Sequence, residues 1–417
     1  MVGQRIRYYR KVKGLTQEEL AQGICSVSYL SKIEKGDAKS SDEVINLLCD
    51  RLGISPNEAN NDEILEMLDE WNMMMVNKRF DEAGEFQKTV QEKMQGVSDP
   101  NILLRYELFN CRCIMVCYDN FDEAFLLLQK INGLIPKDNL FDLQFYYNQF
   151  LGMCFSTKYQ PQNALKHYKL AEEYHQKSNL RDIEAAVIYF QLAITYNELS
   201  KVSIVNFYAY KAITIFDKEY NYSRSADCQI ILAIANRRVR NYEQAIYHLD
   251  QALKYAKTFK DDNTEGIIYH NLGNIAATKN EHSKAIKYLL KSVELRQHQS
   301  PDNVMNTLWL LSKEYFYINN LEESIKWIEK GIQHVENSIN PSFFHHFSIL
   351  NYQIHDNKSG LEEFLRKEAI PFFENQDQFE HISTYSELLA DLYFDQSLYK
   401  KASLYYRLAN NARKNIF

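Results

Sequence analysis

Cysteine and histidine are among the residue types in this chain that could bind a metal or act as nucleophiles, and their spacing helps to decide whether they do. The pair His345–His346 follows two phenylalanines and is typical of packing or of a surface position rather than of a metal site. No histidine stands at metal-ligand spacing beside the tightest group of cysteines. We therefore expect no metal ion, no cofactor, and reduced thiols at Cys25, Cys49, Cys111, Cys113, Cys117, Cys154 and Cys228.

The motifs of common enzymes are missing from the sequence. It contains no glycine-rich phosphate loop, no nucleophile elbow, and no cluster of histidine, cysteine and acidic residues with ligand spacing. A metabolic enzyme is therefore the hypothesis that the sequence supports least, and we expect a binding protein.

Composition and charge indicate an all-α protein with a small basic head on an acidic body. Gly (13) and Pro (7) are scarce, whereas Tyr (29) and Phe (23) are abundant. Residues 1–39 carry eight Lys or Arg against four Asp or Glu, which leaves 40 against 51 for the remainder. Such a body is not expected to coat nucleic acid along its length. The sequence shows no secretory leader and no run of 18 apolar residues, so we expect a cytoplasmic protein without a membrane partner.

Capping signals predict five short helices within about the first 65 residues. Thr16 and Glu19 form a capping box before a second helix. Ser26 is placed to cap a third helix, residues 27–35, which Gly36 ends. Further caps are predicted at Ser40 and Ser55. We assign residues 1–60 to this domain.

Two segments of this head, residues 14–21 and 29–36, resemble the helix-turn-helix of the Xre/Cro/lambda-repressor class. In that family the third helix enters the major groove of DNA, and the start of the second helix touches the backbone. By position, the resemblance implies that Arg10 and Gln17 hold phosphates. It also implies that bases are read or flanked by Ser26, Val27, Ser28, Tyr29 and Lys32.

A periodic small residue indicates that residues 61–417 are built from helical repeats. The series consists of Ala83, Ala124, Ala164, Ala245, Ala285 and Ala402, with Val205, Ser324 and a weak member near Glu363 filling the gaps. Successive members are 41, 40, 41, 40, 40, 39, 39 and 39 residues apart. A second small residue lies twelve positions earlier in six repeats, as at Gly273. The pattern resembles the tetratricopeptide repeat and predicts about nine hairpins in a right-handed superhelix with a concave groove; HEAT-type repeats are the structural alternative.

The first helix of each predicted hairpin should line this groove one turn before and after its small residue. Amide side chains suit an extended peptide backbone, because each has a donor and an acceptor. Arg237, with Arg238 and Arg240, forms a basic spot for a ligand carboxylate. The alternative for each residue is an ordinary polar position on a solvated helix or between hairpins. The predicted peptide-binding residues are Gln149, Asn197, Arg237, Asn271, Asn274, Trp309 and Lys313.

An Xre-type head followed by tetratricopeptide-like repeats resembles the peptide-pheromone sensors of Firmicutes, the Rap, Rgg, NprR, PlcR and PrgX group. Residues 23–34 are most similar to NprR and PlcR, and the length favours NprR. The resemblance implies a quorum-sensing transcription regulator that binds a double-stranded DNA operator and a short signalling peptide. We expect a homodimer or a tetramer, since one head covers only a half-site.

The same resemblance implies an alternative function. The repeat body could bind a response regulator of the sporulation phosphorelay, or act as its phosphatase through a glutamine. Gln87, Gln91 and Gln95 lie in a comparable early helical stretch.

Overall fold

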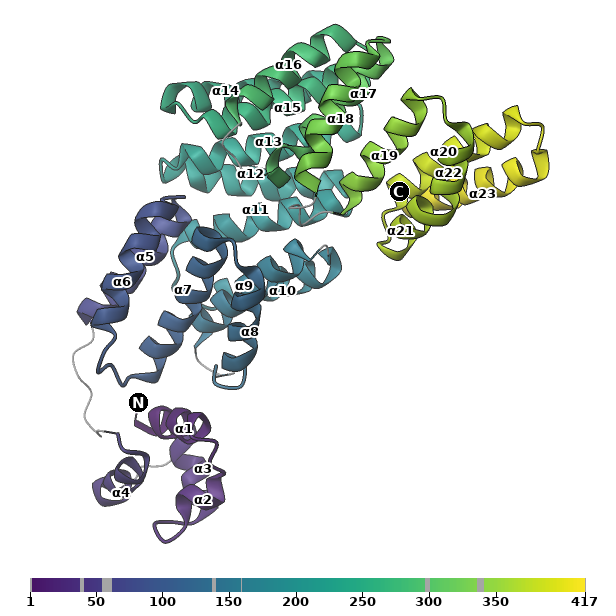
Figure 1. The fold of residues 1–417 in the computed structure, drawn as a ribbon. Helices are drawn as coiled ribbons and strands as arrows, with labels where there is room; N and C mark the ends of the chain where they lie inside the picture. The colour runs from purple at the N-terminus through teal and green to yellow at the C-terminus, as the bar shows by residue number, and fades with distance from the viewer. Residues whose placement is uncertain are drawn as a thin grey trace. The chain divides into compact units, whose positions relative to one another are not determined.

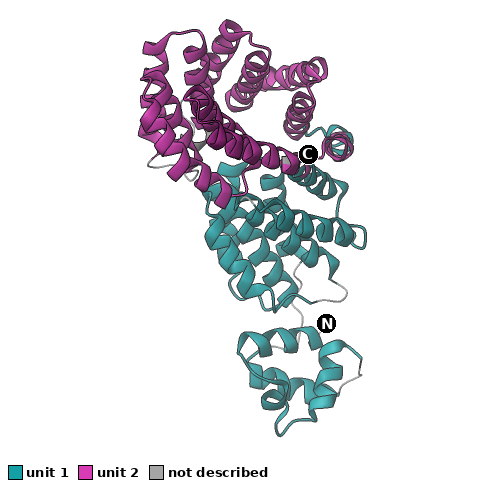
Figure 2. Cartoon of the chain, turned by 90° about the vertical axis from the view of Figure 1, so that its right-hand side faces the viewer, with its two compact units in different colours: residues 1–195, 214–221 teal, residues 196–213, 222–417 magenta. Residues whose placement is uncertain are grey.

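The computed structural model describes residues 2–37, 41–54, 62–136, 140–158, 160–296, 301–335 and 341–416, and within them it contains helices and no strand. The predicted all-α class is confirmed. The chain divides into two compact units, residues 1–195 with 214–221 and residues 196–213 with 222–417 (Figure 2).

The described residues of the head form four short helices around one apolar core (Figure 1). Leu20, Leu30 and Leu48 come from three different helices and are fully buried. Gly3 lies against the third helix so closely that a Cβ there would stand 2.0 Å from the Ile33 carbonyl oxygen. The helices are α1 (Val2–Val12), α2 (Gln17–Ala21), α3 (Val27–Lys35) and α4 (Asp42–Leu52).

Most of the predicted caps of the head are present. Thr16 and Glu19 form the capping box, and Ser26 accepts a hydrogen bond from the Tyr29 amide. Gly36 ends α3 with φ 83°, in the left-handed region that glycine adopts without strain. The cap of α4 is Ser41, which accepts from the Val44 amide; the predicted cap Ser40 lies outside the described residues. The cap predicted at Ser55 lies outside the described residues, so the boundary at residue 60 stays a prediction.

Three hairpins of the repeat body belong to the first unit: α5 (Asp62–Val76) with α6 (Phe80–Lys93), α7 (Pro100–Tyr118) with α8 (Phe121–Ile131), and α9 (Phe141–Thr157) with α10 (Pro161–His175). The consecutive helices α11 (Asp182–Glu198) and α12 (Val202–Lys218) are each shared between the units.

The second unit contains five hairpins: α13 (Tyr222–Arg238) with α14 (Tyr242–Phe259), α15 (Asp262–Thr278) with α16 (His282–Leu295), α17 (Pro301–Tyr317) with α18 (Leu321–Val335), α19 (Ser342–Ile354) with α20 (Lys358–Phe364), η1 (Leu365–Ala369) and α21 (Ile370–Asn375), and α22 (Phe379–Asp395) with α23 (Tyr399–Ile416). The helix order from α5 to α23 follows the nine predicted pairs.

The periodic small residues lie where the two helices of a hairpin meet. A Cβ on Gly152 of α9 would stand 2.4 Å from the ring of Tyr168 on α10, so this position admits no larger residue without movement. Where serines replace the small residues, the Ser324 hydroxyl donates to the Ser312 carbonyl across the same contact, at 2.8 Å. Buried small residues of this kind let helices approach closely.

The eighth hairpin departs from the predicted pattern. Glu363, the weak member of the series, is exposed and pairs with Lys367. Its helix starts after the cap Asn357, and Leu361, four residues later, takes the buried position at 3% exposure. The second helix of this hairpin then widens into the π-helical segment η1. The register there follows the cap rather than a fixed 39-residue step.

A recurring turn joins the two helices of a hairpin. After α13, the Arg240 amide donates to the Arg237 carbonyl and the Asn241 amide to the Asn236 carbonyl, both at 2.9 Å. Arg240, between the two helices, has a left-handed backbone conformation although it is not glycine. Eight turns of the described residues share this feature, at Lys78, Asp119, Ser200, Arg240, Asn280, Asn319, Asp356 and Ser397.

Candidate DNA and peptide interfaces

The N-terminal end of α3 presents a polar surface to solvent. The side chains of Ser26, Val27, Ser28 and Lys32 are exposed, and the Ser26 and Ser28 hydroxyl oxygens lie 3.1 Å apart. Tyr29 is half-buried and packs against the head core. Small hydroxyls and a lysine at the start of an exposed helix can donate to base edges and phosphates.

Arg10 forms contacts within the head that were not predicted from the sequence. Its guanidinium makes two hydrogen bonds to the Glu34 carboxylate, from Nε at 2.6 Å and from Nη2 at 3.0 Å, and Nη1 donates to the Leu15 carbonyl at 2.8 Å. Arg10 is 11% exposed and Glu34 is 3% exposed. We therefore assign Arg10 to the packing of α1 against α3, and its predicted phosphate contact stays a prediction.

Gln17 belongs to the same network, because its Nε2 donates to Glu34 at 2.7 Å. It is half-buried at the first position of α2, directly after the cap Thr16. The network fixes Gln17 at the N-terminal end of α2, where backbone amides also point outward and favour an anion. The predicted phosphate contact of Gln17 stays a prediction.

Five of the predicted peptide-binding residues occupy related positions on first helices of the second unit. Asn197 and Arg237 are 40 residues apart, at the ends of α11 and α13. Asn274 and Lys313 are 39 residues apart on α15 and α17, and Trp309 lies one turn before Lys313. The Asn197 side-chain oxygen and the Arg237 Nε are buried without a hydrogen-bond partner. Both atoms could bind a polar ligand group.

The surroundings of Arg237 are polar and largely dehydrated. Burial lowers the pKa of Arg237, and the neighbouring charge of Arg238 lowers it further. Burial also lowers the pKa of His270 on α15 to about 3, with Arg296 and Arg237 adding to the effect, so this imidazole is neutral. The His270 Nδ1 lies 3.0 Å from the Thr307 hydroxyl. An anionic group entering here would meet Arg237 at low dielectric, where ion pairs are strong.

Sequence reasoning missed His270 and Arg296. His270 stands 39 residues before Trp309, and this spacing could have identified it. Arg296 follows α16 and is 7% exposed, and its side-chain stem packs where Gly266 of α15 carries no Cβ. Gly266, a glycine inside a helix, was the signal in the sequence that could have indicated this contact.

Two residues predicted for the groove or its basic spot are committed to contacts within the protein, and a third is buried. Gln149 is fully buried and donates to Gln191 at 3.4 Å, but its side-chain oxygen has no hydrogen-bond partner, so its peptide contact stays a prediction. Asn271 donates to the Ile267 carbonyl of its own helix at 2.9 Å. Arg238 donates to the Asn197 carbonyl at 2.7 Å and the Ser200 hydroxyl at 2.8 Å. Arg238 therefore pins a turn and leaves Arg237 as the arginine for a ligand.

Trp309 and Lys313 form one stripe along α17 together with Tyr317. The Lys313 ammonium lies 5.3 Å from the Trp309 ring centroid and 5.5 Å from that of Tyr317. The indole also packs beside His346, with ring centroids 5.0 Å apart. A half-buried aromatic with a cation above it can contact an apolar or acidic side chain of a ligand.

The remaining titratable residues show no catalytic arrangement in the described parts of the chain. His345 and His346 pack among aromatic rings, as on Phe372 and Phe373. All seven cysteines are free thiols, and five are buried. Of the residues the structure describes, no three His, Cys, Asp or Glu are grouped to hold a metal. None of the described helices is both long and apolar enough to span a membrane.

The glutamines considered for a phosphatase are differently placed. The Gln87 amide donates to Asn110 at 2.7 Å and accepts from the Tyr118 hydroxyl at 2.9 Å, so it is committed to α7. Gln91 and Gln95 are exposed on the outside of α6 and the turn that follows it. No contact of these residues favours the phosphatase alternative.

Comparison with known proteins identifies the family. A helix-turn-helix model matches residues 6–58, and a tetratricopeptide-repeat model matches residues 225–298. The transcriptional activator NprA of Geobacillus stearothermophilus is 30% identical over 405 residues, which are 95% of this chain and 99% of that protein. This chain belongs to the NprA family. The predicted relationship to helix-turn-helix regulators with tetratricopeptide repeats is therefore confirmed, and family membership favours a regulator over an enzyme.

Solved structures share the fold of this NprA-family chain. A Rap protein complexed with competence and sporulation factor aligns with a TM-score of 0.74 and 19% identity, over 85% of this chain and 99% of that one. NprR in complex with its cognate peptide NprX aligns with a TM-score of 0.69 and 22% identity, over 86% of this chain and 100% of that one. These likenesses confirm the repeat architecture predicted from the sequence.

Proposed function

We propose that this NprA-family protein is a quorum-sensing transcription regulator that reads DNA with α3 and is controlled by a short peptide bound in its repeats. The observation that carries the DNA-binding half is the exposed start of α3, where Ser26, Val27, Ser28 and Lys32 project from a basic head. Membership of a family that includes a transcriptional activator supports it. A role in reading DNA supports the cytoplasmic location that we propose with it.

The DNA-binding proposal is tested with double-stranded fragments selected from a random pool by the full-length protein. Ser28→Ala combined with Lys32→Ala removes two exposed side chains without touching the head core. We expect at least a tenfold loss of affinity for selected fragments, since base and phosphate contacts are worth about 1–3 kcal/mol each. Lys257→Ala, which changes an exposed lysine of α14, is the matched control. An unchanged footprint in the double variant would exclude α3 as the reading helix.

The peptide-binding half rests on Arg237 and Asn197, which keep buried polar atoms without partners in the second unit. Buried polar atoms are normally satisfied, so a site with two such atoms is suited to a polar ligand. NprR is known in complex with a cognate peptide, and its fold is shared. We infer that a peptide carboxylate contacts Arg237, with Asn274, Trp309 and Lys313 contacting other parts of the peptide.

Sedimentation of the full-length protein, with and without the short peptides secreted by cells that express it, tests this half. We expect a homodimer whose mass or DNA retention shifts with the peptide fraction, with a tetramer as the alternative ligand-bound state. Arg237→Gln, which keeps a polar side chain but removes the charge, should abolish the shift and leave basal DNA binding unchanged. DNA binding without any response to peptides would instead indicate a protein partner for the repeats.

A further inference from the structure

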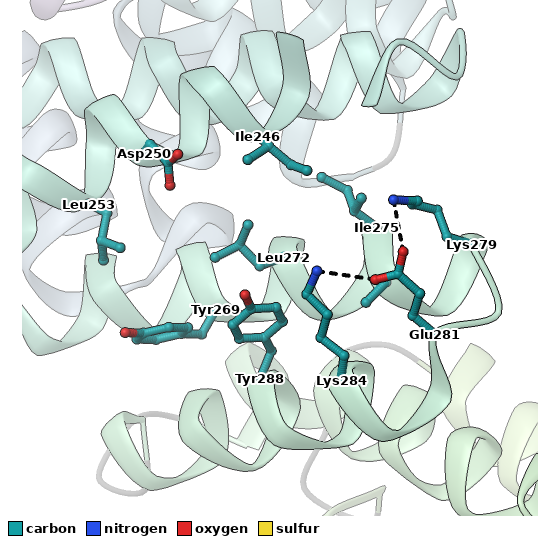
Figure 3. A pocket seen from close by; sticks show the side chains of 11 residues that line it. Ile246, Asp250, Leu253, Tyr269, Leu272, Ile275, Lys279, Glu281, Lys284 and Tyr288 are labelled. Atoms are coloured by element: carbon teal, nitrogen blue, oxygen red, sulfur yellow. Dashed lines mark hydrogen bonds and ion pairs between the residues drawn. The ribbon is translucent and has the colours of Figure 1, made fainter. Parts of the chain in front are cut away.

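The face of α15 opposite the proposed peptide site carries two neighbouring hollows. At 100° per residue, Tyr269, Leu272 and Ala276 lie on one side of α15, whereas His270 and Asn274 lie on the other. The first hollow has a volume of about 350 Å³ and is lined by α14, α15 and α16 (Figure 3). It is thus a separate surface, inside the second unit, that the proposed peptide site does not use.

The first hollow has an apolar floor and a polar rim. Ile246 and Leu253 of α14 face Leu272 and Ile275 of α15 across it (Figure 3). Tyr269 and Tyr288 stack at one side, with ring centroids 6.0 Å apart. A hollow of this size and lining can take one large apolar side chain.

The second hollow begins where the first one ends. It has a volume of about 690 Å³, shares Tyr269 and Tyr288 with the first, and continues along α16 past Ile286 and Leu290. Leu290 is 37% exposed. Two apolar hollows on either side of a tyrosine pair form an elongated surface, which suits a chain segment with two apolar side chains better than a compact small molecule.

Four lysines and three acidic residues line the two hollows, a net charge of +1 in a protein whose net charge is −7. Lys279 and Lys284 share one carboxylate, that of Glu281, at 2.8 and 3.1 Å (Figure 3). Lys287 lines the second hollow and makes no ion pair with any residue in the described parts of the chain. The helix α16 carries three lysines and one glutamate, and Lys291 pairs with that glutamate, Glu294, at 3.1 Å. The remaining excess of lysine on α16 complements an acidic occupant.

We propose that this surface, lined by α14, α15 and α16, is a second binding site, which takes an acidic segment of a partner protein. Two apolar side chains of the segment enter the hollows on either side of Tyr269 and Tyr288, and its carboxylates pair with Lys284 and Lys287. Amphipathic segments bind grooves in this way, with apolar anchors for affinity and rim charges for selectivity. The site is independent of the signalling peptide and lies on the other side of α15.

Random 12-residue peptides displayed on phage, selected on the immobilised full-length protein, provide the probe. Enriched sequences are synthesised with a fluorescent label, and their affinities are measured by anisotropy. We expect acidic peptides with at least two large apolar residues. Lys284→Glu combined with Lys287→Glu should weaken them at least fivefold, because two rim charges change sign. Lys254→Glu combined with Lys257→Glu, on exposed positions of α14 outside both hollows, should change their affinity less than twofold.

Two further variants separate this site from the proposed peptide groove. Arg237→Gln should leave the acidic peptides bound, and Tyr288→Ala, checked for folding by its thermal melt, should release them. The variant with Lys284→Glu and Lys287→Glu should bind double-stranded DNA fragments normally. Loss of the second site is therefore distinguishable from loss of DNA binding. The proposal is overturned if no acidic peptide is enriched, or if enriched peptides respond to Arg237→Gln instead. It is also overturned if the lysine variant changes only self-association, which would identify a second copy as the occupant.

Discussion

Removing the carboxylate of Glu34 is predicted to destabilise the head. In Glu34→Ala the guanidinium of Arg10 stays only 11% exposed but loses two hydrogen bonds and its counter-charge. Gln17 loses its partner as well. Breaking a buried ion pair from one side costs about 3–5 kcal/mol. The bond from Arg10 to the Leu15 carbonyl survives, so we expect the lower end, about 3 kcal/mol.

Hydrogen exchange of the full-length protein measures this loss locally. A destabilisation of about 3 kcal/mol raises the exchange rate of protected amides in α1 and α3 by about a hundredfold. Glu43→Ala, an exposed glutamate on α4, is the matched control and should leave exchange unchanged. Combining Glu34→Leu with Arg10→Met removes both charges and should recover most of the protection. Equal exchange in Glu34→Ala and the wild type would refute the assignment of Arg10 to head packing.

Three further predictions concern the repeats. Gly152→Ala places a Cβ 2.4 Å from the Tyr168 ring and should lower the free energy of unfolding by about 1–3 kcal/mol in urea, whereas Gly133→Ala, with no atom within 4 Å, should not. Lys260 has a left-handed backbone with φ 54°, which glycine adopts without a steric penalty. Lys260→Gly should therefore raise the urea midpoint by an amount equivalent to about 1 kcal/mol. A lower midpoint would contradict this. Burial lowers the folded-state pKa of His346 to about 2, so below pH 6.5 only the unfolded state gains this proton and stability falls with falling pH. In His346→Phe, the slope of unfolding free energy against pH between 6 and 4 should be shallower by about 1.4 kcal/mol per pH unit. An identical slope in the variant and the wild type would show that His346 does not contribute to the pH dependence.

Local and periodic features were predictable from the sequence. The capping box at Thr16 and the left-handed Gly36 follow from residue type and position alone, because caps are decided within one helical turn. The small residues of the hairpins were also found, since a repeated contact leaves a repeated residue. Ala245 and Ala285 are buried as this reasoning requires.

Features that depend on several helices were not predictable in this way. Arg10 looked like a phosphate ligand because its partner Glu34 lies 24 residues away, and only packing joins them. Gln149 was assigned to a groove surface, yet its side chain is fully buried. Leu361 was missed because its hairpin departs from the common period. The lysine-lined hollows arise from three helices and leave no sequence pattern of their own.

The turn inside the hairpins has a consequence for how such a chain can change over generations. Eight turns of the described residues have the same left-handed backbone with five different residue types, from Lys78 to Ser397. Packing of the helices therefore imposes the turn, and the residue in it is free to vary. Unequal recombination that adds or deletes about 40 residues would rejoin equivalent turns, as expected when each repeat contacts its neighbours. Descendants of this gene should thus gain or lose length in whole hairpins.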